Sequence, residues 1–107
     1  MAYLPRGVAQ PTELVKHLNP LDPLLAEAGA VKWRYTIDED WSGDPAIFFW
    51  ITLSDETADP RILGQTARRI KDLIYRQVDP QGQWGLIPYF NFRSQSEQAQ
   101  LKDEAFG

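Results

Sequence analysis

The chain has no cysteine and only one histidine, His17, among its 107 residues. The lack of cysteine excludes disulfides, thiolate metal sites, iron–sulfur ligation and thiol nucleophiles. A lone histidine cannot form a multi-histidine metal site, so a structural role is predicted for it. No serine lies in a G-x-S-x-G motif. The residues therefore predict no catalytic group, no cofactor and no metal site, and an enzyme is only the third functional hypothesis.

Long apolar runs are also missing. The longest, AIFFWITL at residues 46–53, has eight residues, whereas a membrane helix needs about 20. The start of the sequence lacks the apolar core of a signal peptide. These observations predict a cytoplasmic protein without a membrane partner. The net charge of −4 disfavours a general nucleic-acid binder, because such proteins usually carry a positive field.

Alternation of apolar and polar residues predicts three strands. In residues 31–38, VKWRYTID, the four odd-numbered residues share an apolar face and the others share a polar face. Residues 46–53 are apolar on both faces, which is typical of a central strand. The third strand is predicted in WGLIPYFNF, residues 84–92. Pro88 predicts either an edge strand or a strand that begins only after Pro88, because proline lacks the N–H that a sheet ladder needs.

Capping residues and apolar stripes predict the helices. Residues 11–29 contain one broken helix or two short ones, because an Asn-Pro pair interrupts the pattern. Asp22-Pro23 and Asp59-Pro60 each supply an N-cap followed by a first-turn proline. Residues 61–78 carry one apolar stripe at helical spacing. The SQSE sequence at 94–97 has the spacing of a capping box and begins a short last helix.

The resulting order, α–β–β–α–β–α, predicts an α+β fold. A two-layer sandwich is expected, in which a three-stranded sheet carries its helices mainly on one face. Residues 1–10 show no periodicity and are predicted to be an N-terminal arm, and residues 11–107 are predicted to form a single domain.

The candidate site is the sheet face that the helices leave open. Alternation places the aromatic residues Phe48, Trp50 and Tyr89 there, with Arg34 and Arg93 at the rim. Three interpretations stay open at this point. The chain's own termini fold over this face, or it binds a second copy or another protein, or its aromatic rings stack on single-stranded RNA.

The first functional hypothesis is therefore a small non-catalytic interaction module that binds itself or another protein. The alternative is a nucleic-acid-binding accessory protein.

The predicted helix at 61–78 carries a basic stripe. Its members are Arg61, Arg68, Arg69 and Arg76. A solvated helix face is the usual meaning of such charges, and contacts with an acidic protein partner or with phosphate groups are the alternatives.

The acidic turn at residues 38–44 matches the first half of a calcium-binding loop, D-x-D-x-S-G. The second half does not match, because Phe49 stands where a bidentate glutamate would be required. A solvated turn between two strands is predicted, and cation binding there is left open.

The runs WSGDPAIFFWITLSDE and IPYFNFRSQSEQ resemble a group of short bacterial proteins without an assigned function, over roughly residues 31–106. The resemblance supplies no catalytic residue and implies a small accessory partner. The element order also resembles KH-like RNA-binding domains. These need a G-x-x-G loop between two helices, whereas GQWG at 82–85 follows the helix and lacks flanking basic residues.

Overall fold

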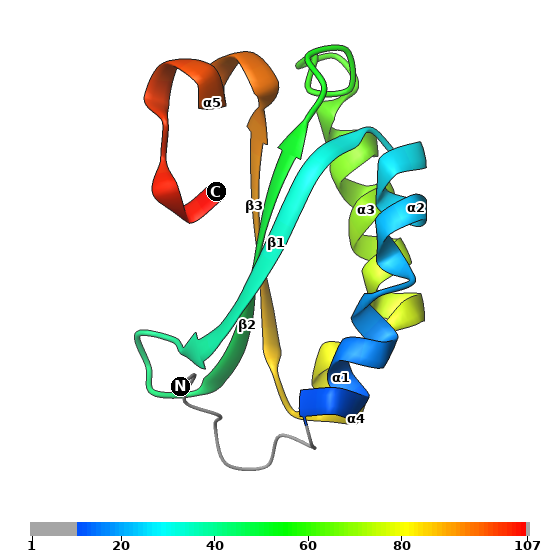
Figure 1. Cartoon of the computed structure of the whole chain (residues 1–107), viewed down its shortest axis with the longest axis vertical. Helices are drawn as coiled ribbons and strands as arrows, with labels where there is room; N and C mark the ends of the chain where they lie inside the picture. Colours follow the sequence, from blue (N-terminus) through cyan, green and yellow to red (C-terminus); the bar gives the residue numbers. More distant parts are fainter. Residues whose placement is uncertain (1–10, 107) are drawn as a thin grey trace.

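The computed structural model describes residues 11–106, and the predicted arm at 1–10 lies outside the described residues. Its centre is a three-stranded mixed sheet with the spatial order β1-β2-β3 (Figure 1). The strands are β1 Ala30–Glu39, β2 Pro45–Leu53 and β3 Ile87–Ser94. β1 and β2 form an antiparallel hairpin, whereas β3 runs parallel to β2. The predicted α+β fold is confirmed.

Helices cover one face of the sheet much more fully than the other (Figure 1). The helices on the first face are α1 Pro11–Leu18, α2 Leu21–Glu27, α3 Leu63–Gln77 and α4 Pro80–Trp84. The second face carries α5 Gln95–Leu101 and the 3-10 turn η1 Glu104–Phe106. The prediction of helices mainly on one face is right, and the C-terminal residues add a partial layer on the other.

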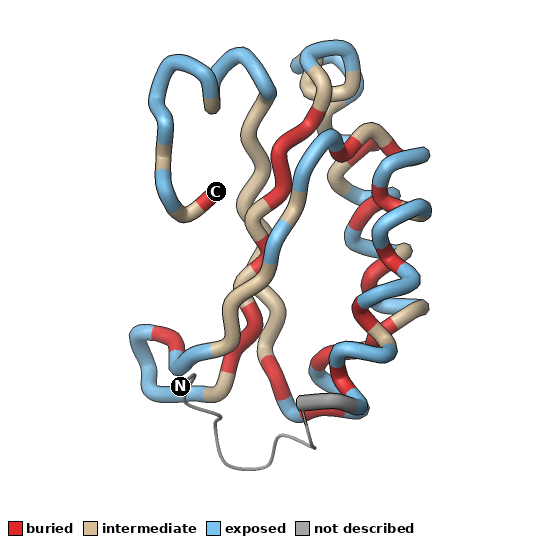
Figure 2. Tube along the Cα trace, in the orientation of Figure 1, coloured by how far each residue is buried: buried red, intermediate tan, exposed pale blue. Residues whose placement is uncertain are grey.

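The core lies between the sheet and the helices of the first face, where Figure 2 shows the buried residues facing one another. The odd-numbered residues of β2 after Pro45 are fully buried: Ile47, Phe49, Ile51 and Leu53. They pack in one cluster with α1, α2 and α3, to which α3 contributes Ile70 and Ile74. β2 is central because both of its edges are paired, as its apolar character on both faces predicted.

Two predicted helix starts are wrong. α2 begins at Leu21, and the Asp22 carboxylate accepts a 2.6 Å hydrogen bond from the Trp33 indole instead of capping the helix. α3 begins at Leu63, and the Asp59 carboxylate accepts the N–H of Arg61 over 2.9 Å and forms an ion pair of 2.8 Å with the Arg61 guanidinium. Asp22 has a side-chain partner that competes with the orphan N–H groups of a helix start, whereas Asp59 closes the turn that precedes α3.

The predicted third strand starts too early, because its first residues belong to the short helix α4 and to the turn after it. Asp79 caps α4, since its side chain accepts an N–H from the first turn. Trp84 is buried at the end of α4 and donates its indole N–H to the Val78 carbonyl over 3.1 Å. The ring of half-buried His17 contacts Trp84 edge-on at 5.5 Å, in line with a structural histidine. The prediction of an edge strand is confirmed for β3.

Val31 departs from the predicted apolar face of β1. A β-bulge between Ala30 and Lys32 shifts the register there, and Val31 is 50% exposed while Ala30 is buried. A bulge adds one residue to one strand, so the alternation of faces changes at that point. The remaining apolar residues of this face, Trp33, Tyr35 and Ile37, pack against the core as predicted.

Candidate functional site on the second sheet face

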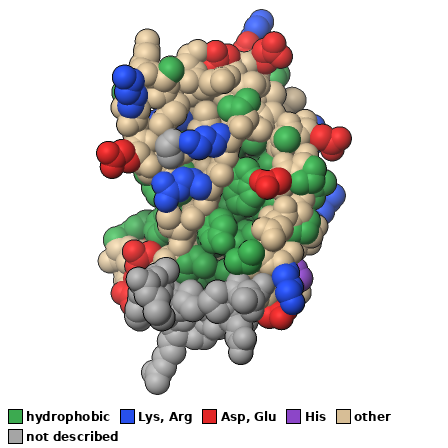
Figure 3. Space-filling model, in the orientation of Figure 1, with side chains coloured by type: hydrophobic (Ala, Val, Ile, Leu, Met, Phe, Trp, Pro, Cys, Tyr) green, Lys and Arg blue, Asp and Glu red, His purple; other side chains and the backbone are tan. Residues whose placement is uncertain are grey.

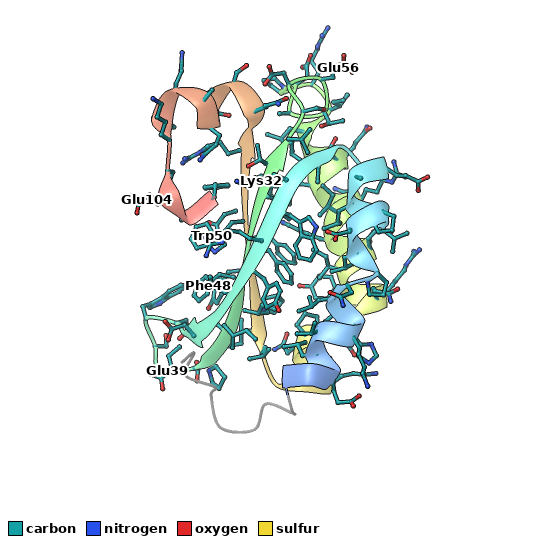
Figure 4. All side chains as sticks on the ribbon, in the orientation of Figure 1. Lys32, Glu39, Phe48, Trp50, Glu56 and Glu104 are labelled. Atoms are coloured by element: carbon teal, nitrogen blue, oxygen red, sulfur yellow. The ribbon has the colours of Figure 1, made fainter. Side chains whose placement is uncertain are left out.

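The structure brings the three predicted aromatic residues together on the second face. Phe48 and Trp50 project from β2 on the side away from α1, α2 and α3 (Figure 4). Tyr89 of β3 lies opposite Phe48 in the parallel register. The Phe48 ring stacks on Tyr89 at 5.2 Å and on Trp50 at 6.3 Å, measured between ring centroids. All three side chains are half-buried.

Trp41 extends this row, and sequence reasoning missed it. It lies in the turn between β1 and β2, is 82% exposed, and places its ring 5.2 Å from that of Tyr89. The contact depends on the parallel pairing of β3 with β2, which brings Tyr89 to the turn. An exposed tryptophan in a polar turn was the signal available in the sequence. We call Trp41, Phe48 and Tyr89 the aromatic surface.

The acidic turn is tied to the aromatic surface by the buried residue Asp40. Its carboxylate accepts a hydrogen bond of 2.7 Å from the Tyr89 hydroxyl and further bonds from the backbone N–H groups of Ser42 and Asp44. The bond from Tyr89 is the main cause that lowers the pKa of Asp40, and the same bond raises the pKa of Tyr89. The Asp40 carboxylate is thus occupied by hydrogen bonds from the turn backbone and from Tyr89, which favours the solvated-turn interpretation over cation binding. Among the described residues, no three acidic or histidine side chains group as metal ligands.

The chain's C-terminal residues cover the Trp50 end of the face. Phe106 is only 4% exposed and meets Trp50 edge-on at 5.6 Å. The Arg93 guanidinium lies 4.5 Å from the centroid of the Phe106 ring and forms a 3.2 Å ion pair with Asp103. We call residues 95–106 the C-terminal segment.

Arg34, the second predicted rim residue, also contacts the C-terminal segment, because its Nη1 atom donates to the Glu104 carbonyl over 3.1 Å. We call Arg34, Trp50 and Arg93 the anchor site. Coverage by the chain's own terminus is therefore the correct interpretation for this end of the face. A role of these three residues in partner binding stays a prediction.

The C-terminal segment packs loosely apart from its last residues. An open pocket of about 550 Å³ separates α5 from the sheet, and its lining includes Val31, Lys32 and Thr52. Figure 3 shows Lys and Arg side chains gathered over this part of the surface, with a band of hydrophobic side chains below them. The Thr52 residue is 4% exposed and its hydroxyl has no hydrogen-bond partner among the described residues.

The predicted basic stripe is only partly assembled. Arg68, Arg69 and Arg76 are exposed on α3 and line one shallow pocket of about 340 Å³ together with the acidic residue Asp72. Arg61 precedes α3, and its guanidinium is engaged by Asp59, which raises the pKa of Arg61 and lowers that of Asp59. Three of the four arginines can therefore contact one ligand together.

Comparison of the chain with protein-family models, curated proteins and solved structures found no match. The resemblance to short bacterial proteins stays a prediction. None of the described helices is long and apolar enough to span a membrane.

Proposed function

We propose that this protein is a small non-catalytic interaction module of the cytoplasm, which binds another protein through the aromatic surface. The observation that carries the proposal is Trp41, which is 82% exposed and yet held against the Tyr89 ring. Tryptophan and tyrosine are the residues most enriched among the anchors of protein interfaces. A cluster of large aromatic rings on an exposed turn and the adjoining strands is typical of such a docking surface.

The aromatic surface is also held in place before any partner arrives. The turn closes through a 2.9 Å hydrogen bond from Asp40 N–H to the Asp44 carbonyl, and Gly43 takes the positive φ of 83° that the turn needs. Asp40 then fixes the Tyr89 hydroxyl. A preorganised surface loses less side-chain freedom on binding, so more of its contact energy contributes to affinity.

The charge around the aromatic surface favours a partner with basic side chains. Asp38, Glu39 and Asp44 are exposed in or beside the turn that carries Trp41. A symmetric second copy would bring these acids close to their equivalents, and a nucleic acid would bring phosphates. Both are disfavoured by like-charge repulsion, whereas lysine or arginine on another protein would be attracted.

The test compares purified wild-type protein with Trp41→Ala and with the control Leu101→Ala, which removes an apolar side chain that is 61% exposed on α5. Quantitative affinity capture from the native host identifies candidate partners, and calorimetry with the purified partner then gives Kd. The proposal expects Trp41→Ala to weaken binding about tenfold or more and Leu101→Ala to leave it unchanged. Equal affinities for wild type and Trp41→Ala would contradict it.

Light scattering on the same samples tests the self-association alternative. A dimer near twice 12.3 kDa that Trp41→Ala converts to a monomer would mean that a second copy occupies the aromatic surface. The partner would then be this chain itself and not another protein.

The pocket between Arg68, Arg69 and Arg76 on α3 supports the nucleic-acid alternative. This alternative expects single-stranded RNA to bind at low salt, with an affinity that falls steeply as salt rises. Arg68→Ala would weaken that binding and Trp41→Ala would not. Absence of binding at low salt would exclude it.

A further inference from the structure

The C-terminal segment is held on the sheet mainly by its last four residues. α5 has no buried residue and Leu101 is 61% exposed. The open pocket of about 550 Å³ lies beneath α5, and the buried Thr52 hydroxyl that lines it has no hydrogen-bond partner among residues 11–106. Phe106, in contrast, is 4% exposed. Apart from a 3.4 Å hydrogen bond from Arg93 to Gln98 of α5, the hydrogen bonds and ring contacts of the segment with Arg34, Trp50 and Arg93 come from residues 103–106.

These contacts recognise two side chains of the segment and one backbone carbonyl. The Phe106 ring sits on Trp50, and Arg93 covers the same ring while it pairs with the carboxylate of Asp103. Arg34 contacts the backbone of the segment, because its guanidinium donates to the Glu104 carbonyl. An acidic residue and an aromatic residue three positions later are therefore recognised together, with one arginine contacting both.

Residues 103–106 leave α5 at Lys102, and one hydrogen bond of 2.8 Å from Gln98 Nε2 to the Asp103 carbonyl links them to the helix. Lys102 follows the last residue of α5 and has a positive φ of 49°, a backbone conformation that residues other than glycine rarely adopt. The start of α5 is fixed separately, because Asp55 accepts hydrogen bonds from the N–H and hydroxyl of Ser96. The backbone thus changes direction between a capped helix and residues 103–106, of which Asp103, Glu104 and Phe106 contact the anchor site.

We infer that the anchor site, Arg34, Trp50 and Arg93, is a docking site for an acidic segment of a partner protein. The segment has an aspartate followed three residues later by an aromatic residue, and residues 103–106 of this chain occupy the site as an intramolecular competitor. The acidic charge of the partner segment suits the two arginines. The ion pair of Asp103 with Arg93 and the ring contact of Phe106 with Trp50 show how such a segment would bind. This site lies beyond the aromatic surface of the proposed function, which it adjoins through the stacked pair Phe48 and Trp50.

A partner protein is favoured over the same segment of a second copy. A short tether gives the chain's own segment an effective concentration on the order of millimolar. An identical segment on a second copy, present at micromolar concentration, cannot displace it. A partner segment with more aromatic or acidic contacts can displace it. The apparent Kd of that partner segment equals its intrinsic Kd divided by the fraction of molecules in which the site is vacant.

The experiment measures fluorescence anisotropy of a labelled peptide, KDEAFG, which copies residues 102–107, with full-length protein. Phe106→Ala removes the ring of the intramolecular competitor. We expect this variant to bind the peptide at least about tenfold more tightly than wild type does, and the peptide KDEAAG to show no binding. Arg93→Ala added to Phe106→Ala should abolish binding, and Arg69→Ala added to Phe106→Ala should leave it unchanged, because Arg69 lies on α3.

A folded Phe106→Ala protein, judged by circular dichroism, that does not bind KDEAFG would overturn the inference. If Phe106→Ala does not fold, Asp103→Asn is measured instead, because it keeps the ring and removes the ion pair with Arg93. Peptide binding tighter than that of wild type supports the inference, and equal binding overturns it. Trp41→Ala should not change peptide binding, so failure here and failure of the proposed function are distinguishable.

Discussion

Single carboxylates connect loops to strands and helices that are distant in the sequence. The Asp40 carboxylate accepts a hydrogen bond from the Tyr89 hydroxyl, and the Asp55 carboxylate accepts hydrogen bonds from the N–H and the hydroxyl of Ser96. These hydrogen bonds are the main causes that lower the pKa of each aspartate below its ordinary value of 3.8. A carboxylate with a lower pKa in the folded state stabilises the fold above its unfolded-state pKa. That stability is lost as pH falls below about 4 and through the folded-state pKa.

Tyr89→Phe is expected to raise the pKa of Asp40, because it removes the hydrogen bond that contributes most to the shift. Titration of the side-chain carboxyl ¹³C resonances by NMR measures the midpoints. The Asp40 midpoint should move upward towards 3.8, while that of Asp55 stays where it is because Ser96 is untouched. An Asp40 midpoint that is the same in both proteins would contradict this account of the acidic turn.

Gly29→Ala is expected to destabilise the fold by about 2 kcal/mol, because Gly29 has a strained backbone position for any other residue. Its φ is +109°, and an added Cβ would lie 2.4 Å from Cγ2 of Thr57. Thr57 cannot retreat freely, since its hydroxyl donates to the Gly29 carbonyl. Urea denaturation gives the free energy of unfolding.

The matched control for Gly29→Ala is Gly64→Ala, at a glycine in α3 with no heavy atom within 4 Å of an added Cβ. Alanine favours the helix there, so an unchanged or up to about 1 kcal/mol higher stability is expected. Equal losses in the two variants would show that the contact with Thr57 has no special cost.

At the scale of elements, a capping prediction succeeds where its partners are close in the chain. The predicted capping box at 94–97 is present: the Ser94 hydroxyl accepts from the N–H of Glu97, and the Glu97 carboxylate accepts from the N–H of Ser94. The predicted cap at Asp22 fails because its carboxylate accepts a hydrogen bond from the Trp33 indole. Asp59 does accept the N–H of Arg61, but in the turn that precedes the start of α3 at Leu63. Trp33 lies on a strand whose packing against α2 the local sequence does not encode.

Ser94→Ala is expected to cost α5 about 1 kcal/mol of local stability, because it removes the capping hydroxyl. Hydrogen exchange of the α5 amides should become about fivefold faster. The global free energy of unfolding should change less, since α5 contributes no buried residue.

Ser42→Ala serves as the control for Ser94→Ala, because it keeps the backbone N–H that Asp40 accepts and lies in the β1–β2 turn. Its α5 amides should exchange at the wild-type rate. If Ser94→Ala also leaves these rates unchanged, the capping box does not stabilise α5.

At the scale of the whole molecule, the two faces of the sheet differ in how they are packed. The first face meets α1, α2 and α3 in one continuous core. The second face has the loosely packed C-terminal segment at one end and the exposed Trp41 at the other. Stability is therefore expected to depend mainly on the first face.

Ile74→Ala and Trp41→Ala test this division. Ile74 of α3 is fully buried in the core, so truncation should cost about 2–5 kcal/mol through lost burial and a cavity. Trp41 is 82% exposed, so its truncation should cost less than about 1 kcal/mol. Urea denaturation measures both, and a large loss for Trp41→Ala would instead make Trp41 a structural residue.

The sequence by itself determined the element order apart from the short helix α4, the central place of β2 and the face on which Phe48, Trp50 and Tyr89 lie. These features follow from alternation, helical spacing and local caps, which act over a few residues. Only the tertiary structure decided that Trp41 stacks on Tyr89, that Phe106 covers Trp50 and that both rim arginines hold the C-terminal segment. The contact between Arg34 and Glu104 joins residues 70 positions apart. Such contacts depend on strand pairing and chain direction, which no local pattern of residues encodes.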